Sequence, residues 1–181
     1  VGDGQARNVG CDADRVYVAG EGTLRAYSSS DGSPLWTRIN GERTPNSYCA
    51  LEVDRGTVFW FATGVYGTGG TTLTTLRALD PDGAMLWESA TEVESPQGWG
   101  FGGIAASATM VCVGWDDFTA TARRTLRCLD RHTGSPVWEK AFYNGRSRGS
   151  SLTPCFSPDG SILVFAGTDS SNSFLAGYRA R

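Results

Sequence analysis

A tryptophan that recurs at a fixed spacing constrains the fold of this chain more than any other feature of its sequence. Trp36, Trp87 and Trp138 lie 51 residues apart, and each ends a similar segment. The segments read RAYSSSDGSPLW (25–36), RALDPDGAMLW (77–87) and RCLDRHTGSPVW (127–138). Periods of about 40–50 residues are typical of chains built from repeated structural units. The 181 residues therefore hold about three full repeats and most of a fourth.

Each repeat reads as four short strands joined in sequence. In the second repeat, apolar residues and turn residues predict strands over 49–53, 57–62, 75–80 and 84–89. The 24 Gly and 11% aromatic residues favour many turns between strands. We therefore expect an all-β chain of four-stranded antiparallel repeats, with boundaries near 1–40, 41–91, 92–142 and 143–181.

A single four-stranded sheet cannot bury both of its faces, whereas sheets arranged around an axis cover one another. The sequence therefore predicts a β-propeller segment, with three complete blades and most of a fourth, that belongs to a larger ring. Two alternatives for closing the ring stay open: pairing with a second copy of the chain, and self-closure as four blades.

The repeated segment has a structural interpretation. Gly32, Gly83 and Gly134 are expected to provide positive φ angles in the turn before the last strand. Trp36, Trp87 and Trp138 are expected to insert between adjacent blades and lock them together. Four arginines also recur at similar spacing and are expected to form ladders or ion pairs between blades: Arg25, Arg77, Arg127 and Arg179.

The five cysteines show no CxxC spacing and include at least one unpaired thiol. All lie in apolar segments that resemble strands, so we expect buried thiols that act as small hydrophobic residues. A bridge between Cys112 and Cys128 on neighbouring strands is the main alternative.

The segment CLDRHTGSPVW (128–138) resembles the tryptophan-docking repeat of the PQQ-like, or quinoprotein-like, β-propellers. A looser similarity relates CFSPDGSILVFAG (155–167) to WD-repeat and TolB-like propellers. The first resemblance implies a ring of seven or eight blades, in a family that includes quinone-dependent dehydrogenases and non-enzymatic assembly lipoproteins. The adjacent cysteines typical of the dehydrogenases, and the CxxCH sequence that attaches haem, do not occur in this sequence.

Loop lengths indicate where a partner would bind. The predicted loops 63–72, 91–102, 114–125, 143–150 and 168–173 emerge on one face and are long, whereas turns on the other face are tight. Aromatic residues and arginines are common interface anchors. The candidate partner-binding residues on the long-loop face are Tyr66, Trp99, Trp115, Asp116, Phe118, Arg123, Arg124, Arg146 and Arg148.

The leading functional hypothesis is a non-catalytic propeller scaffold that binds proteins through its long-loop face, without cofactor or metal. The alternatives are a fragment of a PQQ-dependent dehydrogenase and a carbohydrate-binding or polymer-binding propeller. The net charge of −3 gives no strong attraction to nucleic acid, and no apolar run is long enough to span a membrane. The family resemblance favours a periplasmic or extracellular location, whereas unpaired cysteines favour the cytoplasm.

Overall fold

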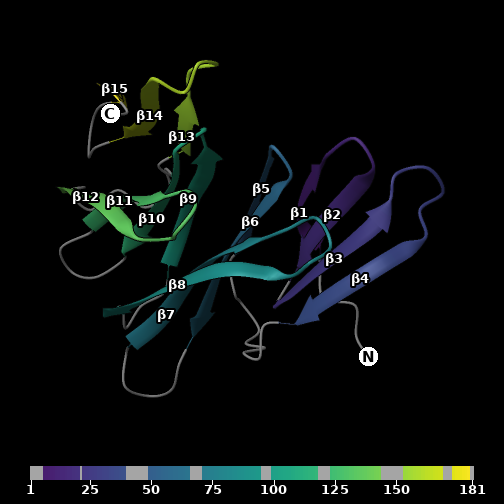
Figure 1. Ribbon diagram of the computed structural model, residues 1–181. Coiled ribbons are helices and arrows are strands. Elements are labelled where there is room, and N and C mark those ends of the chain that lie inside the picture. The colour runs from purple at the N-terminus through teal and green to yellow at the C-terminus, as the bar shows by residue number, and fades with distance from the viewer. Residues whose placement is uncertain are drawn as a thin grey trace. The chain divides into compact units, whose positions relative to one another are not determined.

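The computed structural model describes residues 6–20, 22–39, 49–65, 71–94, 99–117, 123–143, 153–168 and 173–179. Fifteen strands and no helix occur in these ranges, so the all-β prediction is confirmed (Figure 1). The strands form four antiparallel sheets, called blades 1 to 4 below, and each sheet follows the order of the sequence.

Blades 1 and 2 lie in one compact unit of the chain, which comprises Val1–Gly67 and Thr72–Val93. Blade 1 is formed by β1 (Ala6–Cys11), β2 (Arg15–Gly20), β3 (Thr23–Ser28) and β4 (Pro34–Ile39). Blade 2 is formed by β5 (Cys49–Asp54), β6 (Thr57–Val65), β7 (Thr71–Leu79) and β8 (Met85–Glu94).

Blades 3 and 4 lie in the other compact unit, which comprises Thr68–Thr71 and Glu94–Arg181. Blade 3 is formed by β9 (Trp99–Ala106), β10 (Met110–Asp117), β11 (Arg123–Asp130) and β12 (Pro136–Tyr143). Blade 4 has three strands among the described residues, β13 (Thr153–Phe156), β14 (Ile162–Thr168) and β15 (Ser173–Arg179). Three complete blades and most of a fourth are therefore present, as the 51-residue period predicts.

The glycine of the repeated segment has the predicted conformation in all three copies. Gly32, Gly83 and Gly134 have φ angles of 72°, 82° and 71°, in the left-handed region that other residues avoid. In blade 3, the Gly134 N–H donates to the Asp130 carbonyl at 2.9 Å and closes the turn. The turn before the last strand therefore depends on glycine in each complete blade.

An apolar core joins blade 1 to blade 2. Alternate residues of the blade 1 strands, such as Tyr17, Ala19 and Leu24, are fully buried because successive side chains of a strand point to opposite faces. They pack in one cluster with Leu51, Val58 and Trp60 of blade 2. These two sheets therefore cover each other's apolar faces, as adjacent propeller blades do.

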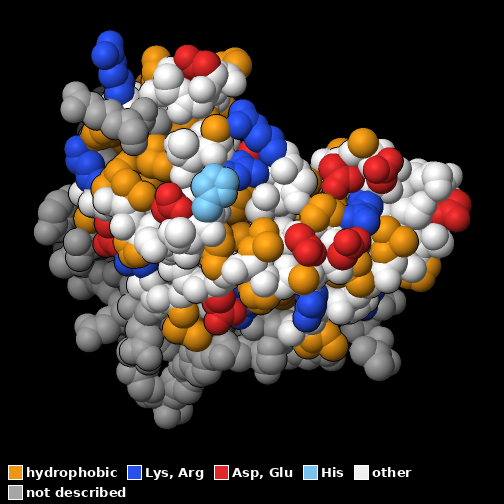
Figure 2. Space-filling model, in the orientation of Figure 1, with side chains coloured by type: hydrophobic (Ala, Val, Ile, Leu, Met, Phe, Trp, Pro, Cys, Tyr) orange, Lys and Arg blue, Asp and Glu red, His pale blue; other side chains and the backbone are white. Residues whose placement is uncertain are grey.

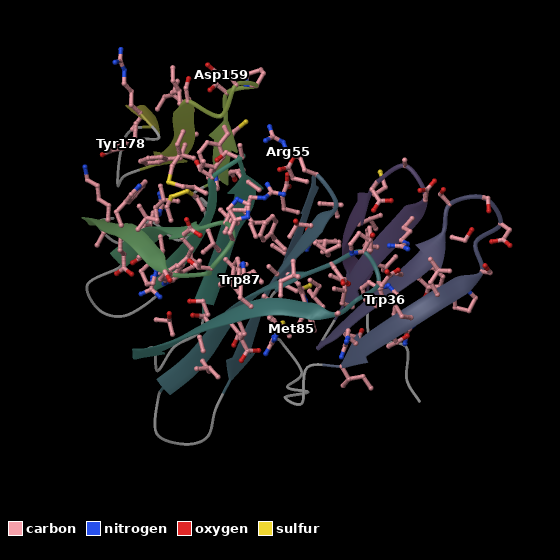
Figure 3. The ribbon with its side chains drawn as sticks, viewed as in Figure 1. Trp36, Arg55, Met85, Trp87, Asp159 and Tyr178 are labelled. Atoms are coloured by element: carbon pink, nitrogen blue, oxygen red, sulfur yellow. A yellow bond between two sulfur atoms is a disulfide. The ribbon has the colours of Figure 1, made fainter. Side chains whose placement is uncertain are left out.

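A second core joins blade 3 to blade 4 and contains a disulfide between Cys112 and Cys128 (Figure 3). The two cysteines lie directly opposite each other on β10 and β11, and both are fully buried. Cys11 and Cys155 are exposed, and Cys49 is a buried thiol outside any disulfide. The expectation of five buried thiols is therefore wrong, because cross-strand register pairs two cysteines and two others lie on strand faces that point away from these cores.

Two of the predicted long loops begin and end as strand in the part of the chain that the structure describes. β6 and β7 pair as far as Val65 and Thr72, and β10 and β11 pair as far as Asp117 and Arg123. Threonine and valine favour extended backbone, and pairing satisfies the backbone N–H and C=O groups that a loop would leave to water. The described residues of the predicted loops 63–72 and 114–125 thus extend the hairpins of blades 2 and 3.

Candidate functional site

Five of the predicted partner-binding residues lie at one end of blade 3. The backbone register places Asp116 opposite both Gly100 and Arg124, and places Asp117 opposite both Trp99 and Arg123. Trp115 lies one position further into the sheet. The three strands β9, β10 and β11 therefore bring aromatic, acidic and basic residues together that are up to 25 positions apart in the sequence.

Two residues of this group are buried. The side chain of Trp115 is 3% exposed and that of Arg124 is 1% exposed. Arg127 of β11 lies over the Trp115 ring, with its guanidinium carbon 5.5 Å from the ring centroid. The expectation that Trp115 and Arg124 stand on the surface is therefore corrected, because both pack into the sheet where the long hairpin extends it.

Four other members of the predicted face, Tyr66, Phe118, Arg146 and Arg148, lie outside the described residues. The strands place the backbone of Trp99, Asp116 and Arg123 at this end of blade 3. Partner binding by this face stays a prediction, and the end of β9, β10 and β11 is its structurally defined part.

The first tryptophan of the repeat docks onto the next blade. The Trp36 indole N–H donates to the Pro81 carbonyl at 2.9 Å, and its ring covers Gly83 (Figure 3). A Cβ atom placed on Gly83 would lie 2.9–3.2 Å from three ring carbons of Trp36. The Trp36 ring also contacts Tyr17, with centroids 5.9 Å apart. Tryptophan and turn glycine thus form one contact between blades, with the ring of one seated on the backbone of the other.

The other two tryptophans are also packed. Trp87 is 9% exposed and its ring centroid lies 6.1 Å from that of Phe59 in the same blade. Trp138 of blade 3 contacts Tyr178 of blade 4, with centroids 5.9 Å apart. A hollow of about 440 Å³ beside this pair was not evident from the sequence, and it is lined by Met110, Val137, Trp138, Glu139, Lys140, Tyr178 and Arg179.

Two of the recurrent arginines form ion pairs within their own blade. Arg77 donates from Nε to Glu88 Oε2 at 2.6 Å, and Arg127 makes the same bond to Glu139, in each case from the third strand to the fourth. Arg77 also lies over the Trp60 ring at 5.3 Å. In blade 4 the equivalent position is Ala176, because it pairs with Phe165 as Arg77 pairs with Trp60. The expectation of Arg179 as a fourth copy is therefore wrong, whereas pairing of the arginines between blades stays a prediction.

A polar network at the tight-turn end joins blade 1 to blade 2. The Tyr17 hydroxyl donates to Asp12 Oδ2 at 2.7 Å, and Arg15 forms a 2.7 Å ion pair with Asp82 of the next blade. Burial, together with the hydrogen bond to Asp12, raises the pKa of Tyr17 to about 12. Burial also tends to raise the pKa of Asp12, but hydrogen bonds from Tyr17, Asp14 and Arg15 outweigh it and lower that pKa. Nothing in the repeat pattern indicated this network.

The face of the described residues seen in Figure 2 shows no large patch of one charge. Acidic, basic and apolar side chains are interspersed on the face seen in Figure 2. Within the described ranges, no three His, Cys, Asp or Glu side chains are placed to share a metal ion. No helix long and apolar enough to cross a membrane occurs in that part of the chain.

Four-stranded blades that stack through apolar faces and a docked tryptophan define a protein of the β-propeller class. A family model described as outer membrane protein assembly factor BamB matches residues 2–98 and 72–171. The chain therefore belongs to this family of PQQ-like propellers, which confirms the resemblance inferred from the repeat. None of the curated protein sequences matches the chain.

Several solved structures share the fold at low sequence identity. A europium-containing methanol dehydrogenase aligns with a TM-score of 0.61 and 14% identity, over 91% of this chain and 36% of that one. Quinohemoprotein alcohol dehydrogenase from Comamonas testosteroni gives 0.58 and 14%, over 91% and 29%. Hsv2 from Kluyveromyces lactis gives 0.54 and 15%, over 91% and 47%. The chain thus spans less than half the length of each of these relatives.

Proposed function

We propose that this chain is a protein-binding propeller segment that acts in assembly and does not catalyse a reaction. The observation that carries the proposal is the family match over residues 2–98 and 72–171, since that family is described as an outer membrane protein assembly factor. The residues that repeat serve blade packing, as Trp36 does on Gly83 and Pro81. Selection of a partner would then fall to residues that do not repeat.

The partner-binding part of the proposed surface is the end of blade 3 where β9, β10 and β11 meet. Opposite charges lie in register there, with Asp116 opposite Arg124 and Asp117 opposite Arg123. Oppositely charged residues directly across two strands stabilise their pairing. The backbone pairing of β9, β10 and β11 extends to this end of the blade and would pre-position its residues for a partner.

We also propose an oxidising compartment, such as the periplasm, for this protein. The buried disulfide between Cys112 and Cys128 supports that location, because disulfides persist mainly outside the reducing cytosol. The BamB-like family description is consistent with it.

Site-specific photocrosslinking tests the proposed surface. A photoreactive amino acid at Trp99 or at Arg123 should crosslink the same protein species from a cell-envelope fraction. The matched control is Thr133, which is exposed in the turn between β11 and β12 at the other end of the same blade. Equal labelling from Thr133, or no labelling from Trp99 and Arg123, would contradict the proposed surface.

A fragment of a quinone-dependent dehydrogenase is the second candidate, because dehydrogenases of that class share the fold. The described residues do not fit the vicinal disulfide site of that class. Cys112 and Cys128 are 16 positions apart and fully buried in the apolar core between blades 3 and 4, so their disulfide does not line an accessible cavity. Saturable binding of the quinone in the presence of Ca²⁺, with dye reduction on adding an alcohol, would overturn the scaffold proposal.

A further inference from the structure

The face of blade 4 that points away from blade 3, called its open face below, has the same pattern of small and apolar side chains as the face of blade 1 that packs on blade 2. Leu163 and Phe165 of β14 and Phe156 of β13 pack toward blade 3, so the residues that alternate with them point the other way. Leu175 on this open face is 75% exposed. The open face of blade 4 is defined by Cys155, Val164, Ala166, Leu175 and Gly177.

Strand register relates each of these residues to one in blade 1. In blade 4, Cys155, Val164 and Gly177 are cross-strand partners in one row, which corresponds to the row Gly10, Tyr17 and Ala26 in blade 1. The cross-strand pair Ala166 and Leu175 corresponds to Ala19 and Leu24. The blade 1 residues pack against blade 2, and four of them are fully buried in the core between those blades. The open face of blade 4 thus has the small and apolar side chains of a face that another blade covers.

The open face of blade 1 corresponds, by strand register, to the face of blade 2 that covers blade 1. A Cβ atom on Gly10 would point toward Val53 and Leu51 of blade 2. The side chains of its neighbours Val9 and Cys11 therefore point to the other face, and Val9 is 65% exposed. The open face of blade 1 is defined by Val9, Cys11, Val16, Val18 and Tyr27. By register these residues correspond to Leu51, Val53, Val58, Trp60 and Leu79, which cover blade 1 from blade 2.

The two open faces therefore fit each other as blades 1 and 2 do, and the described residues present one face of each kind. We propose that two copies of this chain pair with the open face of blade 4 of each copy on the open face of blade 1 of the other. Such a pair covers all four faces and closes with two-fold symmetry, so it does not extend into a filament.

Two exposed cysteines meet at the proposed junction. Cys155 occupies the position of Gly10, and Cys11 occupies the position of Val53. A Cβ atom on Gly10 would lie 2.7 Å from Val53 Cγ2, which is one bond beyond Val53 Cβ. Two Cβ atoms at these positions are then at most about 4.2 Å apart, within the range of a disulfide. At the contact between blades 1 and 2, these two positions hold a glycine and a valine. Two cysteine side chains, each intermediate in size, would fill a similar space between the facing strands.

Mixed cysteine variants test the proposal in the intact chain. Oxidised glutathione converts one thiol to a mixed disulfide, and attack by the second thiol then forms the protein disulfide and releases the second glutathione thiol. The variants C11S and C155S should each form no linked pair alone. Their mixture should form one pair of chains, joined through Cys155 of one copy and Cys11 of the other, as peptide mass spectrometry would show.

Four results would overturn the proposal. A bond between Cys11 and Cys155 of a single chain, with no link in the C11S and C155S mixture, would show that blades 1 and 4 of one chain meet. Links between like cysteines would indicate random surface oxidation, and no link at all would exclude the proposed junction. In solution, Leu175→Glu should lower the mass from two copies to one, whereas Leu86→Glu, on an exposed residue of β8, should leave two copies. A wild-type mass of one copy at all concentrations would also overturn it.

Discussion

Gly83 and Gly32 offer a matched test of the tryptophan contact between blades. Both lie in the turn before the last strand of a blade, with φ angles of 82° and 72°. A Cβ atom on Gly83 meets Trp36 ring carbons at 2.9–3.2 Å, whereas a Cβ atom on Gly32 has nothing within 4 Å. Gly83→Ala and Gly32→Ala therefore impose similar backbone strain, and only Gly83→Ala disturbs the docked ring.

The two substitutions should differ by about 2 kcal/mol in the free energy of unfolding. Left-handed backbone costs a residue with a Cβ atom about 1–2 kcal/mol, and this is the whole expected cost of Gly32→Ala. At Gly83 the added methyl forces the Trp36 ring outward, and overpacking of this kind costs about 1–3 kcal/mol. The 2.9 Å hydrogen bond from Trp36 to the Pro81 carbonyl weakens as the ring moves, and it contributes about 1 kcal/mol. Gly83→Ala should therefore cost about 3–5 kcal/mol.

Urea unfolding of the single variants, and of each in a Trp36→Ala background, measures this difference. Removing the ring should reduce the cost of Gly83→Ala to that of Gly32→Ala, so the two sites couple by about 2 kcal/mol in a double-mutant cycle. The cost of Gly32→Ala should not change in that background. Equal costs for the two glycines in the wild-type chain, or an unchanged cost for Gly83→Ala without Trp36, would refute the docking argument.

Three further predictions concern the disulfide and two titrating groups. Replacing Cys112 and Cys128 together by Ala should lower the free energy of unfolding by about 3 kcal/mol, because the disulfide closes a short loop, and added reductant should then have no further effect on urea unfolding. The pKa of Tyr17 in the folded protein is about 12, above its usual 10. The stability that the neutral hydroxyl contributes is therefore fully present below pH 10 and is lost as the pH rises toward 12. Ultraviolet titration should detect the late ionisation of Tyr17, and Tyr17→Phe should remove this part of the pH dependence. Hydrogen bonds from Ser157 and Ser161 lower the pKa of Asp159 to about 2, so its contribution is present above its usual pKa of 3.8 and is lost as the pH falls toward 2; carboxyl NMR should show the pKa rising in Ser157→Ala.

The sequence predicted the blades and their turns because those features depend on local chemistry and on the period. Gly32, Gly83 and Gly134 need left-handed backbone wherever this turn occurs, so their conformation follows from residue type. The four-strand pattern of each blade likewise follows from alternating apolar residues. These signals act within a few residues of each other, and one chain contains several copies of them.

Features that depend on strand register could not be read from the period. Arg179 keeps the spacing of the other arginines, yet Ala176 occupies their position because the lengths of the hairpins differ between blades. Trp115 and Arg124 fall in a segment rich in polar residues, and only the pairing of β10 with β11 shows that both are buried. The exposure of Cys11 and Cys155 depends on which face of each strand meets another blade.

Residues that repeat in each blade serve stability in this protein, whereas residues that do not repeat are the candidates for partner selection. A docked indole that donates to Pro81, and an arginine bonded to Glu88, already use their polar groups within the chain. Changes at such residues should alter the free energy of unfolding and should weaken the binding of every partner to the same extent. The end of blade 3 has no counterpart in blade 1, where β2 and β3 are joined by a tight turn between Gly20 and Thr23. Changes at Trp99 or Arg123 should therefore alter which partner binds while the blade stays folded, since the register of β9, β10 and β11 is held by residues further along the strands.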